Sequence, residues 1–453
     1  MRYKEWHGSL LVVAAIAVSW SLAGPIFAAS TYWQLDPSTA GNWDDPNNWT
    51  AGVPGSSDLA YVDNGGTANM PTSFASASSI SVGHTHPGYV HQSGGYAYAG
   101  VLMVARSNDV TGSYDLGGGT LNAPSEYVGF AGPGSLLQSD GLNTPRWLYV
   151  GYGLGSSGQY YLNGGSLSAE EQYVGSYASG RVTQSGGTNV VTTILSLGID
   201  VGFRGTYELN AGRLDVQSGQ ISVGPGGSGV LTLNGGTAMA GQMSVRAGTV
   251  HVGKNAAVTI GQIQLANDAS SLTVTRFELS ATKSASIAAS PVGTVTIGAA
   301  GTHTLNLQTG SYRPREGDRF TLMTGFSSIS GTFDAITTNL TLGNAGFSGG
   351  VNTNSYRVTF TGLAAGDANG DHRVNTGDLA QTATSWMTSG KGWGNGEFTG
   401  DGVVGTGDLA LMGTNWLWSL PTPAPDQPIP EPATLALLGT CGAALIRRNR
   451  WPL

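Results

Sequence analysis

The chain has 453 residues, of which 71 are glycine and 11% are charged, and its formal net charge is -8. This length allows two or three domains. An acidic balance without a basic run argues against nucleic acid as a partner, and glycine without a three-residue period excludes collagen. Aliphatic residues set among Ser, Thr and Asn favour strands and tight turns, so we expect a mainly β protein.

The N-terminal segment is typical of a secretory signal. Arg2 and Lys4 precede nine apolar residues, from Leu10 to Val18, and small residues follow at Ala28 and Ala29. This order of basic, apolar and small residues predicts a signal peptide over residues 1–28 and an exported protein. Nine apolar residues are too few to cross a bilayer, which argues against a membrane span here.

Residues 29–80 contain three tryptophans close together, Trp33, Trp43 and Trp49. The segment resembles the tryptophan-containing lead-in of autotransporter-like passenger proteins, which carry Gly-rich repeats. Because an open sheet edge invites pairing with another chain, we expect an N-terminal cap here. The alternative is that the three rings stack on a glycan.

Residues 81–253 contain seven copies of one template, in which the third residue is apolar and the eighth is glycine. Successive copies start 22 to 25 residues apart. An apolar column beside a glycine column is what stacked strands with corner turns require, since such corners need a positive φ. The pattern therefore predicts a β-solenoid repeat array. The copies begin at Gly88, Gly112, Gly134, Gly158, Gly180, Gly205 and Gly229.

Alternate copies differ at the fifth position of the template. Gln92, Gln138 and Gln184 occupy it in the first, third and fifth copies, and leucine occupies it in the others. The alternation suggests duplication of a two-coil unit. A second apolar column, mostly followed by glycine, indicates another strand and corner in each coil. Its members are Val82, Val104, Val128, Val150, Val174, Val223 and Val245.

After residue 253 the period fades, but alternating apolar and polar residues continue to about Phe360. The stretch from Ser311 to Asp334 resembles the closing segment of the same passenger proteins. We therefore expect residues 254–363 to form a β-rich C-terminal cap.

A loop with calcium-ligand spacing begins at residue 367. Calcium takes six to eight oxygen ligands, and this loop offers them at positions 1, 3, 5, 7, 9 and 12, with a main-chain carbonyl at position 7. Position 6 holds His372 instead of the usual glycine, and His tolerates a positive φ better than most side chains do. The expected ligands are Asp367, Asn369, Asp371, Arg373, Asn375 and Asp378.

A second loop of the same length follows thirty residues later. Glu stands at its first position, Thr at its third and Gly405 at its ninth, so we expect it to bind calcium more weakly. The expected ligands are Glu397, Thr399, Asp401, Val403 and Asp408.

Each loop runs into a segment with apolar residues at helical spacing, and both copies contain the sequence TGDLA. We expect the two helices to share a small core. Residues 366–420 thus resemble a type I dockerin. The resemblance implies calcium-dependent folding and docking to a cohesin-type partner in two orientations. A calcium-stabilised spacer without a partner is the alternative. The expected core residues are Leu379, Ala383, Trp386, Leu409, Met412 and Trp416, and the implied partner contacts are Thr376, Gly377, Thr406 and Gly407.

The C-terminal tail combines a Pro-rich linker at 421–429, a Pro-Glu-Pro motif, an apolar stretch and terminal arginines. In that order these features resemble a PEP-CTERM sorting signal over residues 430–453. The resemblance implies transient insertion in the inner membrane of a Gram-negative-type bacterium and cleavage by an exosortase-type enzyme. A plain anchor with a transmembrane helix is the alternative. The residues that carry the signal are Pro430, Glu431, Pro432, Arg447 and Arg448.

The repeats show no catalytic constellation, because their charged residues are scattered singly. Glu170 and Glu171 adjoin, and we expect neighbours on a strand to point to opposite faces. His84 and His86 alternate, which places them on one strand face as a candidate metal pair beside His91. The single cysteine, Cys441, lies in the tail, so we expect no disulfide in the exported part.

Two functions fit the whole sequence. The first is an exported structural or adhesive repeat protein, at the cell surface or outside the cell, that docks through calcium loops to a cohesin-type partner. The alternative is a component that binds or degrades extracellular polysaccharide in a cohesin-organised system, an expectation that comes by analogy.

Overall fold

The computed structural model describes residues 28–417, except positions 38, 73, 266–269, 271, 281–282, 311, 313, 315–317, 340–345, 362–364, 370, 372, 392–394 and 400. The sorting tail, most of the signal peptide and His372 lie outside the described residues. The chain divides into two compact units. Of the described residues, the first unit contains those within 28–310, 321–338 and 350–357, and the second contains those within 312–320, 339–349 and 358–417.

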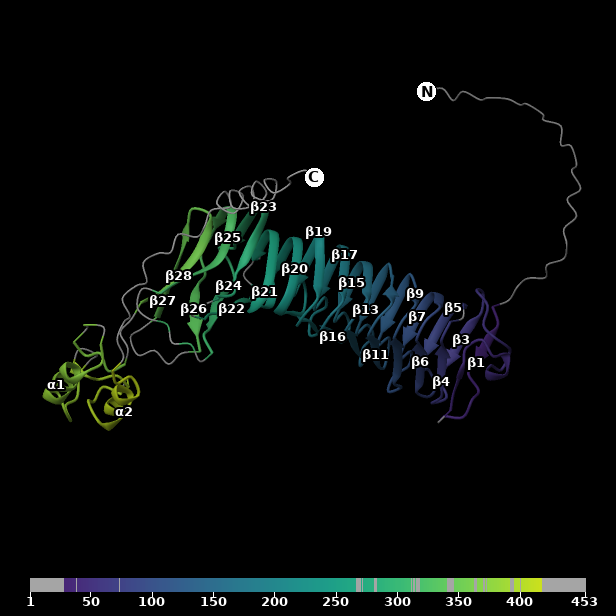
Figure 1. The fold of residues 1–453 in the computed structure, drawn as a ribbon, viewed down its shortest axis with the longest axis horizontal. Helices are drawn as coiled ribbons and strands as arrows, with labels where there is room; N and C mark the ends of the chain where they lie inside the picture. Colours follow the sequence, from purple (N-terminus) through teal and green to yellow (C-terminus); the bar gives the residue numbers. More distant parts are fainter. Residues whose placement is uncertain are drawn as a thin grey trace, which may run out of the picture. The chain divides into compact units, whose positions relative to one another are not determined.

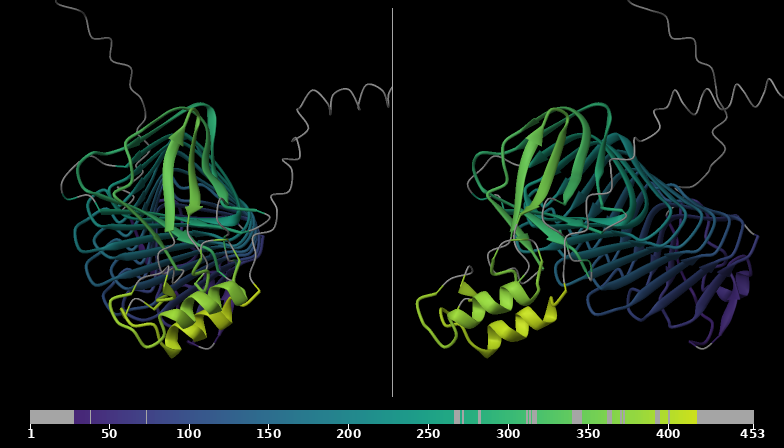
Figure 2. Two further views of the ribbon diagram at one scale, coloured as in Figure 1. Left: turned by 90° about the vertical axis from the view of Figure 1, so that its left-hand side faces the viewer. Right: turned by 60° about the vertical axis from the view of Figure 1, so that its left-hand side comes forward.

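The first unit is a parallel β-solenoid of about ten turns, which confirms the predicted repeat fold (Figure 1). Each complete turn contributes to three parallel ladders. Seen along the stack, successive turns overlie one another (Figure 2). In one ladder Val128 pairs with Val150 and Val150 with Val174, so equivalent residues of successive turns form straight columns.

The strands of the three ladders are as follows. The first ladder contains β1 (Ser30–Tyr32), β3 (Leu59–Val62), β5 (Phe74–Val82), β7 (Tyr96–Val104), β10 (Ser125–Val128), β13 (Trp147–Val150), β15 (Ser166–Val174), β17 (Thr188–Leu197), β19 (Arg213–Val223), β20 (Ser228–Val245), β21 (Ala247–Leu265), β23 (Ile287–Ile297) and β25 (Arg319–Ser330). The second contains β2 (Ala40–Asn42), β4 (Thr67–Met70), β6 (Gly88–Gln92), β8 (Gly112–Leu116), β11 (Pro133–Gln138), β14 (Ser157–Leu162), β16 (Ser179–Gln184), β18 (Arg204–Leu209), β22 (Leu272–Glu278), β24 (Thr302–Gln308), β26 (Ala335–Thr338) and parts of β20 and β21. The third contains β9 (Thr120–Asn122), β12 (Leu142–Asn143) and further parts of the long strands.

Two columns of corner residues turn the chain between ladders. Glycine at the eighth template position has a positive φ in all seven copies, as predicted. The second column consists of the residues that directly follow the predicted valine column. Most of these are glycines with a positive φ, and after Val104 the position is held by Ala105, with φ 58°. Leu197 pairs between Val174 and Val223 and fills the gap in the predicted valine column. Side chains that point inward form the core, with Leu136, Tyr160 and their equivalents fully buried.

The parallel pairing is not confined to residues 81–253. Ala60 pairs with Ile80 in the first ladder, so the segment expected to be a cap is itself part of the stack. On the C-terminal side of residue 253, Val258 pairs with Ile287 in the same way. These outer turns have irregular connections in place of the glycine corners, which is why the template does not find them.

The three N-terminal tryptophans are buried, with relative exposures of 2% for Trp33, 0% for Trp43 and 2% for Trp49. Their rings pack edge to face, and Trp49 Nε1 donates a 2.7 Å hydrogen bond to the main-chain oxygen of Trp43. The 3-10 helix η1 (Pro46–Asn48) carries the chain between Trp43 and Trp49. The glycan-stacking alternative is therefore wrong, because none of the three ring faces is free.

The second unit contains the helices α1 (Thr376–Thr384) and α2 (Thr406–Thr414). It also has an aromatic cluster, in which Phe347 lies 6.2 Å from Phe320 and 5.1 Å from Phe360 between ring centroids. The strands β27 (Gly346–Asn352) and β28 (Ser355–Thr361) are the last strands in the described part of the chain. Within the described residues, no helix has the length and apolar character that a membrane crossing requires.

Candidate metal centres and a surface groove

The first predicted loop brings three carboxylates together. Ligand oxygens of Asp367, Asp371 and Asp378 all lie within 4.8 Å of one another. Asp367 and Asp378 are fully buried, whereas Asp371 is exposed. Carboxylates this close repel each other unless a cation or a proton offsets their charge. The cluster is thus a candidate site for a hard divalent cation.

Main-chain amides fix the orientation of the buried Asp378. Its Oδ1 accepts a 3.1 Å hydrogen bond from the amide of Asn369, and its Oδ2 accepts a 2.9 Å bond from the amide of Asn375. Asp378 lies in the first turn of α1, so the helix holds one end of the loop. The amide of Arg373 donates to Asp371 Oδ1 over 2.9 Å, which orders the middle of the loop.

Asn375 has a role that the spacing did not predict. It is the N-cap of α1, and its Oδ1 accepts a 2.7 Å hydrogen bond from the amide of Gly377. Asn369 is also engaged, because its Oδ1 accepts a 2.9 Å bond from the amide of Asp371. The three carboxylates are therefore the strongest ligand candidates in this loop.

The second loop repeats the arrangement. Ligand oxygens of Glu397, Asp401 and Asp408 lie within 4.8 Å of one another, and Glu397 and Asp408 are buried. Thr399 donates a 3.1 Å hydrogen bond to Glu397 Oε1. The amide of Val403 donates to Asp401 Oδ1 over 2.8 Å. Despite its degraded sequence, the second loop forms a cluster like that of the first.

Asp408 is held as Asp378 is, with one difference at the helix start. Its Oδ1 accepts a 2.8 Å bond from the amide of Thr399, and its Oδ2 accepts a 2.7 Å bond from the amide of Gly405. Burial raises the pKa of Asp408, but hydrogen bonds from these amides and that of Phe398 outweigh it and lower the pKa below its usual range. Gly405 has no side chain, so α2 lacks the cap that Asn375 gives to α1.

The two loop-helix halves of the module contact each other through equivalent hydrogen bonds, as an approximate twofold relationship between them requires. The amide of Met387, which follows α1, donates a 2.8 Å bond to the oxygen of Val404 in the second loop. The amide of Leu417, which follows α2, donates a 2.9 Å bond to the oxygen of Val374 in the first loop. Met387 and Leu417 both have a positive φ, of 58° and 65°. Each loop is thus tied to the segment that follows the other helix.

The core of this module differs from the predicted one. Of the six residues expected to share it, Met412 is fully buried, but Leu379, Trp386, Leu409 and Trp416 are 38 to 41% exposed. Helical spacing identifies a common face and cannot say whether that face is covered. The buried cluster comes mainly from the loops instead. Its members are Ala368, Val374, Phe398 and Met412.

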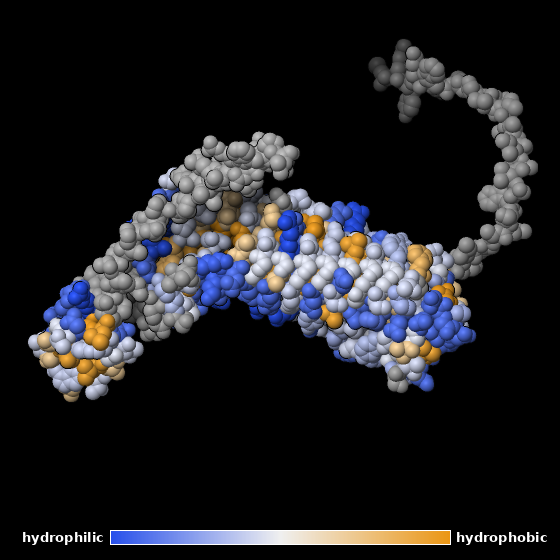
Figure 3. Space-filling view, in the orientation of Figure 1, coloured by the Kyte–Doolittle hydropathy of each residue, from blue (hydrophilic) through white to orange (hydrophobic). Residues whose placement is uncertain are grey.

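Several of the uncovered apolar residues line a surface pocket of about 310 Å³ between the two helices. Figure 3 shows apolar residues, in orange, at the surface of this module. Thr376, Gly377, Thr406 and Gly407 are exposed at the starts of the helices, as a partner contact would require. The pocket is lined by Leu379, Thr382, Ala383, Trp386 and Leu409.

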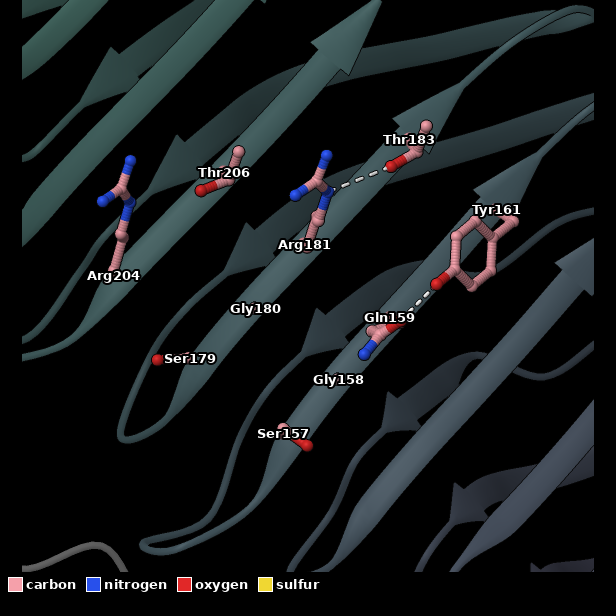
Figure 4. A pocket seen from close by; sticks show the side chains of 10 residues that line it. All are labelled: Ser157, Gly158, Gln159, Tyr161, Ser179, Gly180, Arg181, Thr183, Arg204 and Thr206. Atoms are coloured by element: carbon pink, nitrogen blue, oxygen red, sulfur yellow. Dashed lines mark hydrogen bonds between the residues drawn. The ribbon is translucent and has the colours of Figure 1, made fainter.

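A second hollow lies on the outer face of the solenoid. It is a shallow groove of about 580 Å³ across β14, β16 and β18, with Arg181 and Arg204 on neighbouring strands (Figure 4). Arg181 donates a 3.3 Å bond to Thr183 and contacts Glu208. The remaining lining is small or polar, and no motif in the sequence predicts this groove. The other lining residues are Ser157, Gly158, Gln159, Tyr161, Ser179, Gly180 and Thr206.

The predicted histidine pair does not share a strand. His84 and His86 lie in the bend between β5 and β6, where His84 Nδ1 contacts Ser107 Oγ at 2.8 Å. His91 pairs with Asp115 of the next turn at 2.8 Å. The alternation argument fails because the chain leaves the strand at Gly83. Each of these rings contacts a different partner.

The prediction for Glu170 and Glu171 is also wrong. Both amides donate to the oxygen of Arg146, and this bulge turns both side chains to the outer surface. Glu170 forms an ion pair with Arg146 at 2.8 Å, and Glu171 accepts a 2.8 Å bond from Tyr173. The two carboxylates thus bind different surface partners, Arg146 and Tyr173, and do not face each other as a catalytic pair would.

No protein-family model matches this chain, and no curated protein matches it either. The geometry of the two loops, the helix pocket and the groove is therefore the basis for a functional proposal.

Proposed function

We propose that this is an exported structural or adhesive repeat protein that binds two calcium ions and docks through residues 366–420, as a dockerin does, to a cohesin-type partner. The observation that carries the proposal is the duplicated cluster of carboxylates, each with its ligand oxygens within 4.8 Å. Two such clusters with the same spacing and the same helix after them favour one shared ligand chemistry.

The residues present fit calcium by charge and by atom type. Asp367 and Asp378 are fully buried, and burying ionised carboxylates is costly unless a cation compensates them. The first ion would be held by the three Asp side chains, with Asn369 and the Arg373 carbonyl as further oxygens. The second would be held by Glu397, Asp401 and Asp408, with Thr399 and the Val403 carbonyl. Bound calcium would link each loop to its helix.

The exposed helix starts and the apolar pocket support a docking role. A spacer would gain nothing from leaving Trp386 and Trp416 about two-fifths exposed. Because the two halves exchange equivalent contacts, either pair, Thr376 with Gly377 or Thr406 with Gly407, presents a similar surface. This supports two binding orientations of a cohesin-type partner.

Export and sorting complete the proposal and rest on sequence alone. The signal at 1–28 would direct the chain across the inner membrane of a Gram-negative-type bacterium. The tail at 430–453 would retain it there until an exosortase-type enzyme cleaves it and releases it to the surface or the medium.

The calcium assignment is tested on the full exported chain by isothermal titration after removal of divalent ions. We expect two binding events, of which Asp371→Asn weakens one and Asp401→Asn the other, since both side chains are exposed and their replacement leaves the core intact. Asp140→Asn, an exposed carboxylate in the solenoid, serves as the matched control and should change neither. Absence of calcium uptake by the wild-type chain would refute the assignment.

The groove of Figure 4 favours a second candidate function, the binding of an acidic polysaccharide. Arg181 and Arg204 lie on neighbouring strands, and guanidinium groups pair with carboxylates. Arg181 is already paired with Glu208, so Arg204 is the main candidate contact for an acidic ligand. The small side chains of the lining leave room for an extended chain. No catalytic pair lies among the groove residues, so we propose binding without cleavage.

Affinity electrophoresis in a polyuronate gel and in a neutral glucan gel tests this second function. We expect retardation only by the polyuronate, weaker at high salt and weaker in Arg204→Gln. Arg146→Gln, which lies outside the groove, is the control. Equal retardation of all three proteins would argue against the groove as the binding site.

A further inference from the structure

A buried amide pair joins two turns of the solenoid. Gln172 Nε2 donates a 2.7 Å hydrogen bond to Asn189 Oδ1, and Asn189 Nδ2 donates a 3.0 Å bond back to Gln172 Oε1. Asn189 also donates a 2.9 Å bond to the hydroxyl of Tyr207. All three side chains are fully buried. Each side-chain nitrogen and oxygen of the pair therefore has a hydrogen-bond partner within the protein.

Two turns earlier the same places are filled by a pair that contains an acid. Glu126 aligns with Leu148, and Leu148 aligns with Gln172. Asn143 aligns in the same way with Leu167 and then with Asn189. A glutamate thus replaces the glutamine of the amide pair, and its side chain is also fully buried.

The acid-containing pair has only one of the two hydrogen bonds. Asn143 Nδ2 donates to Glu126 Oε2 over 2.9 Å and to the hydroxyl of Tyr160 over 3.1 Å. The two remaining atoms, Glu126 Oε1 and Asn143 Oδ1, are buried without a hydrogen-bond partner. Both are acceptors when Glu126 is ionised. One proton on Glu126 Oε1 would satisfy both of them and reproduce the reciprocal pair of Gln172 and Asn189.

Among the residues that the structure describes, no positively charged side chain contributes to the environment of Glu126. The residues that align with it on β7 and β13, Leu102 and Leu148, are apolar. The titratable groups that face it are the hydroxyls of Tyr114 and Tyr160, whose own pKa values burial and the Glu126 charge raise. No ion pair to Glu126 exists among the described residues. An ionised carboxylate here would be uncompensated, which is strongly unfavourable.

Burial raises the pKa of Glu126 to about 8, and the hydrogen bond from Asn143 opposes this only in part. An unfolded glutamate has a pKa of about 4.3, so the folded chain holds this proton more tightly. The stabilisation is therefore complete below the unfolded pKa and is lost as the pH rises through the folded pKa.

We propose that Glu126 is a neutral carboxylic acid that shares its proton with Asn143, and that this pair is a base-sensitive latch between neighbouring turns of the solenoid. Removal of the proton leaves a bare negative charge between apolar columns and two unpaired acceptors. The turns that contain β10 to β14 then open more readily.

Hydrogen exchange measured by mass spectrometry on the full chain tests the latch, with peptides from β10 to β14. Comparing wild type with Glu126→Gln at each pH cancels the intrinsic pH dependence of exchange. The ratio of their opening constants should increase nearly tenfold per pH unit between about 5 and 8 and then level off. Glu126→Gln should fold, because glutamine fills the equivalent place at Gln172.

Two further measurements make the result decisive. Gln172→Glu should create the same pH dependence of opening in peptides from β15 and β17. Glu171→Gln, a surface change, should create no such pH dependence. The infrared carbonyl band of a protonated carboxylic acid should be present at pH 6.5 and absent in Glu126→Gln. A ratio independent of pH, or no such band in the wild type, would overturn the proposal.

Discussion

The hydroxyl of Tyr160 donates a 2.6 Å hydrogen bond to Oε1 of Gln138, which lies one turn earlier in the solenoid. Tyr114 makes the same bond to Gln92, and Tyr207 makes it to Gln184, each at 2.6 Å. Gln138 Nε2 donates in turn to the oxygens of Gly141 and Ser166. Each pair of turns therefore carries one glutamine and one tyrosine, which explains why alternate copies of the repeat differ.

Replacing Tyr160 by Phe should destabilise the solenoid. The change leaves Gln138 Oε1 buried without its donor, and an unsatisfied buried group costs about 1 to 3 kcal/mol. Denaturant unfolding followed by circular dichroism measures the effect. Tyr161→Phe, the neighbour on the outer face, is the control and should change stability by less than about 0.5 kcal/mol. A similar effect of both changes would mean that the buried bond is not the cause.

The sequence predicts the glutamines of this network but not the tyrosines that bind them. Glutamine is conspicuous in an apolar repeat, so the alternation of Gln92, Gln138 and Gln184 predicts a two-turn unit. Tyrosine at the third position reads as one more apolar residue, and its partner lies more than twenty positions away. Glu126 is hidden for the same reason, because its alignment with Gln172 depends on register across two turns.

The calcium loops show a similar limit. Ligand spacing is local, so the sequence predicts which residues the two clusters contain. The core of the module depends on how the halves pack, and spacing alone assigned Trp386 and Trp416 to it although both are partly exposed. The cap at Asn375 was also missed, because one side chain can serve as a ligand or as a cap.

Gly175→Ala should be far more damaging than Gly202→Ala, although both glycines have a positive φ. A Cβ at Gly175 would lie 2.3 Å from the main-chain oxygen of Arg204 in the next turn, whereas a Cβ at Gly202 would meet nothing within 4 Å. We expect a loss of about 1 kcal/mol at Gly202 from backbone strain alone. At Gly175 steric overlap adds to that strain, for a total of about 3 kcal/mol. Unfolding midpoints measure both, and equal losses would contradict the close stacking of turns.

Trp43→Ala should destabilise the N-terminal turns without affecting glycan binding. The ring is fully buried against Trp49, at 4.6 Å between centroids, and truncation of a buried aromatic ring costs about 3 to 5 kcal/mol. Hydrogen exchange should increase in β1 to β4. Trp147→Phe, a partly exposed ring under Arg146, is the control. Loss of polyuronate binding in folded Trp43→Ala protein would restore a ligand role for these rings.

Gly405→Asn should stabilise the second calcium loop. Gly405 is extended, with φ -146° and ψ -162°, close to the values of Asn375, and a Cβ there would meet only the oxygen of Val403, at 4.0 Å. Asparagine would cap α2 as Asn375 caps α1, which is worth a few tenths of a kcal/mol over glycine. Reduced freedom of the unfolded chain adds to this, for a total of about 0.5 to 1 kcal/mol.

Asn375→Gly in the first loop is the matched reverse change, and we expect it to lower the stability by a similar amount. Thermal unfolding in saturating calcium and in chelator measures both variants. A gain that is the same in both conditions would assign the effect to the helix cap, and a larger gain in calcium would show that the new side chain also strengthens the ion site. Destabilisation by Gly405→Asn in both conditions would contradict the equivalence of the two loops.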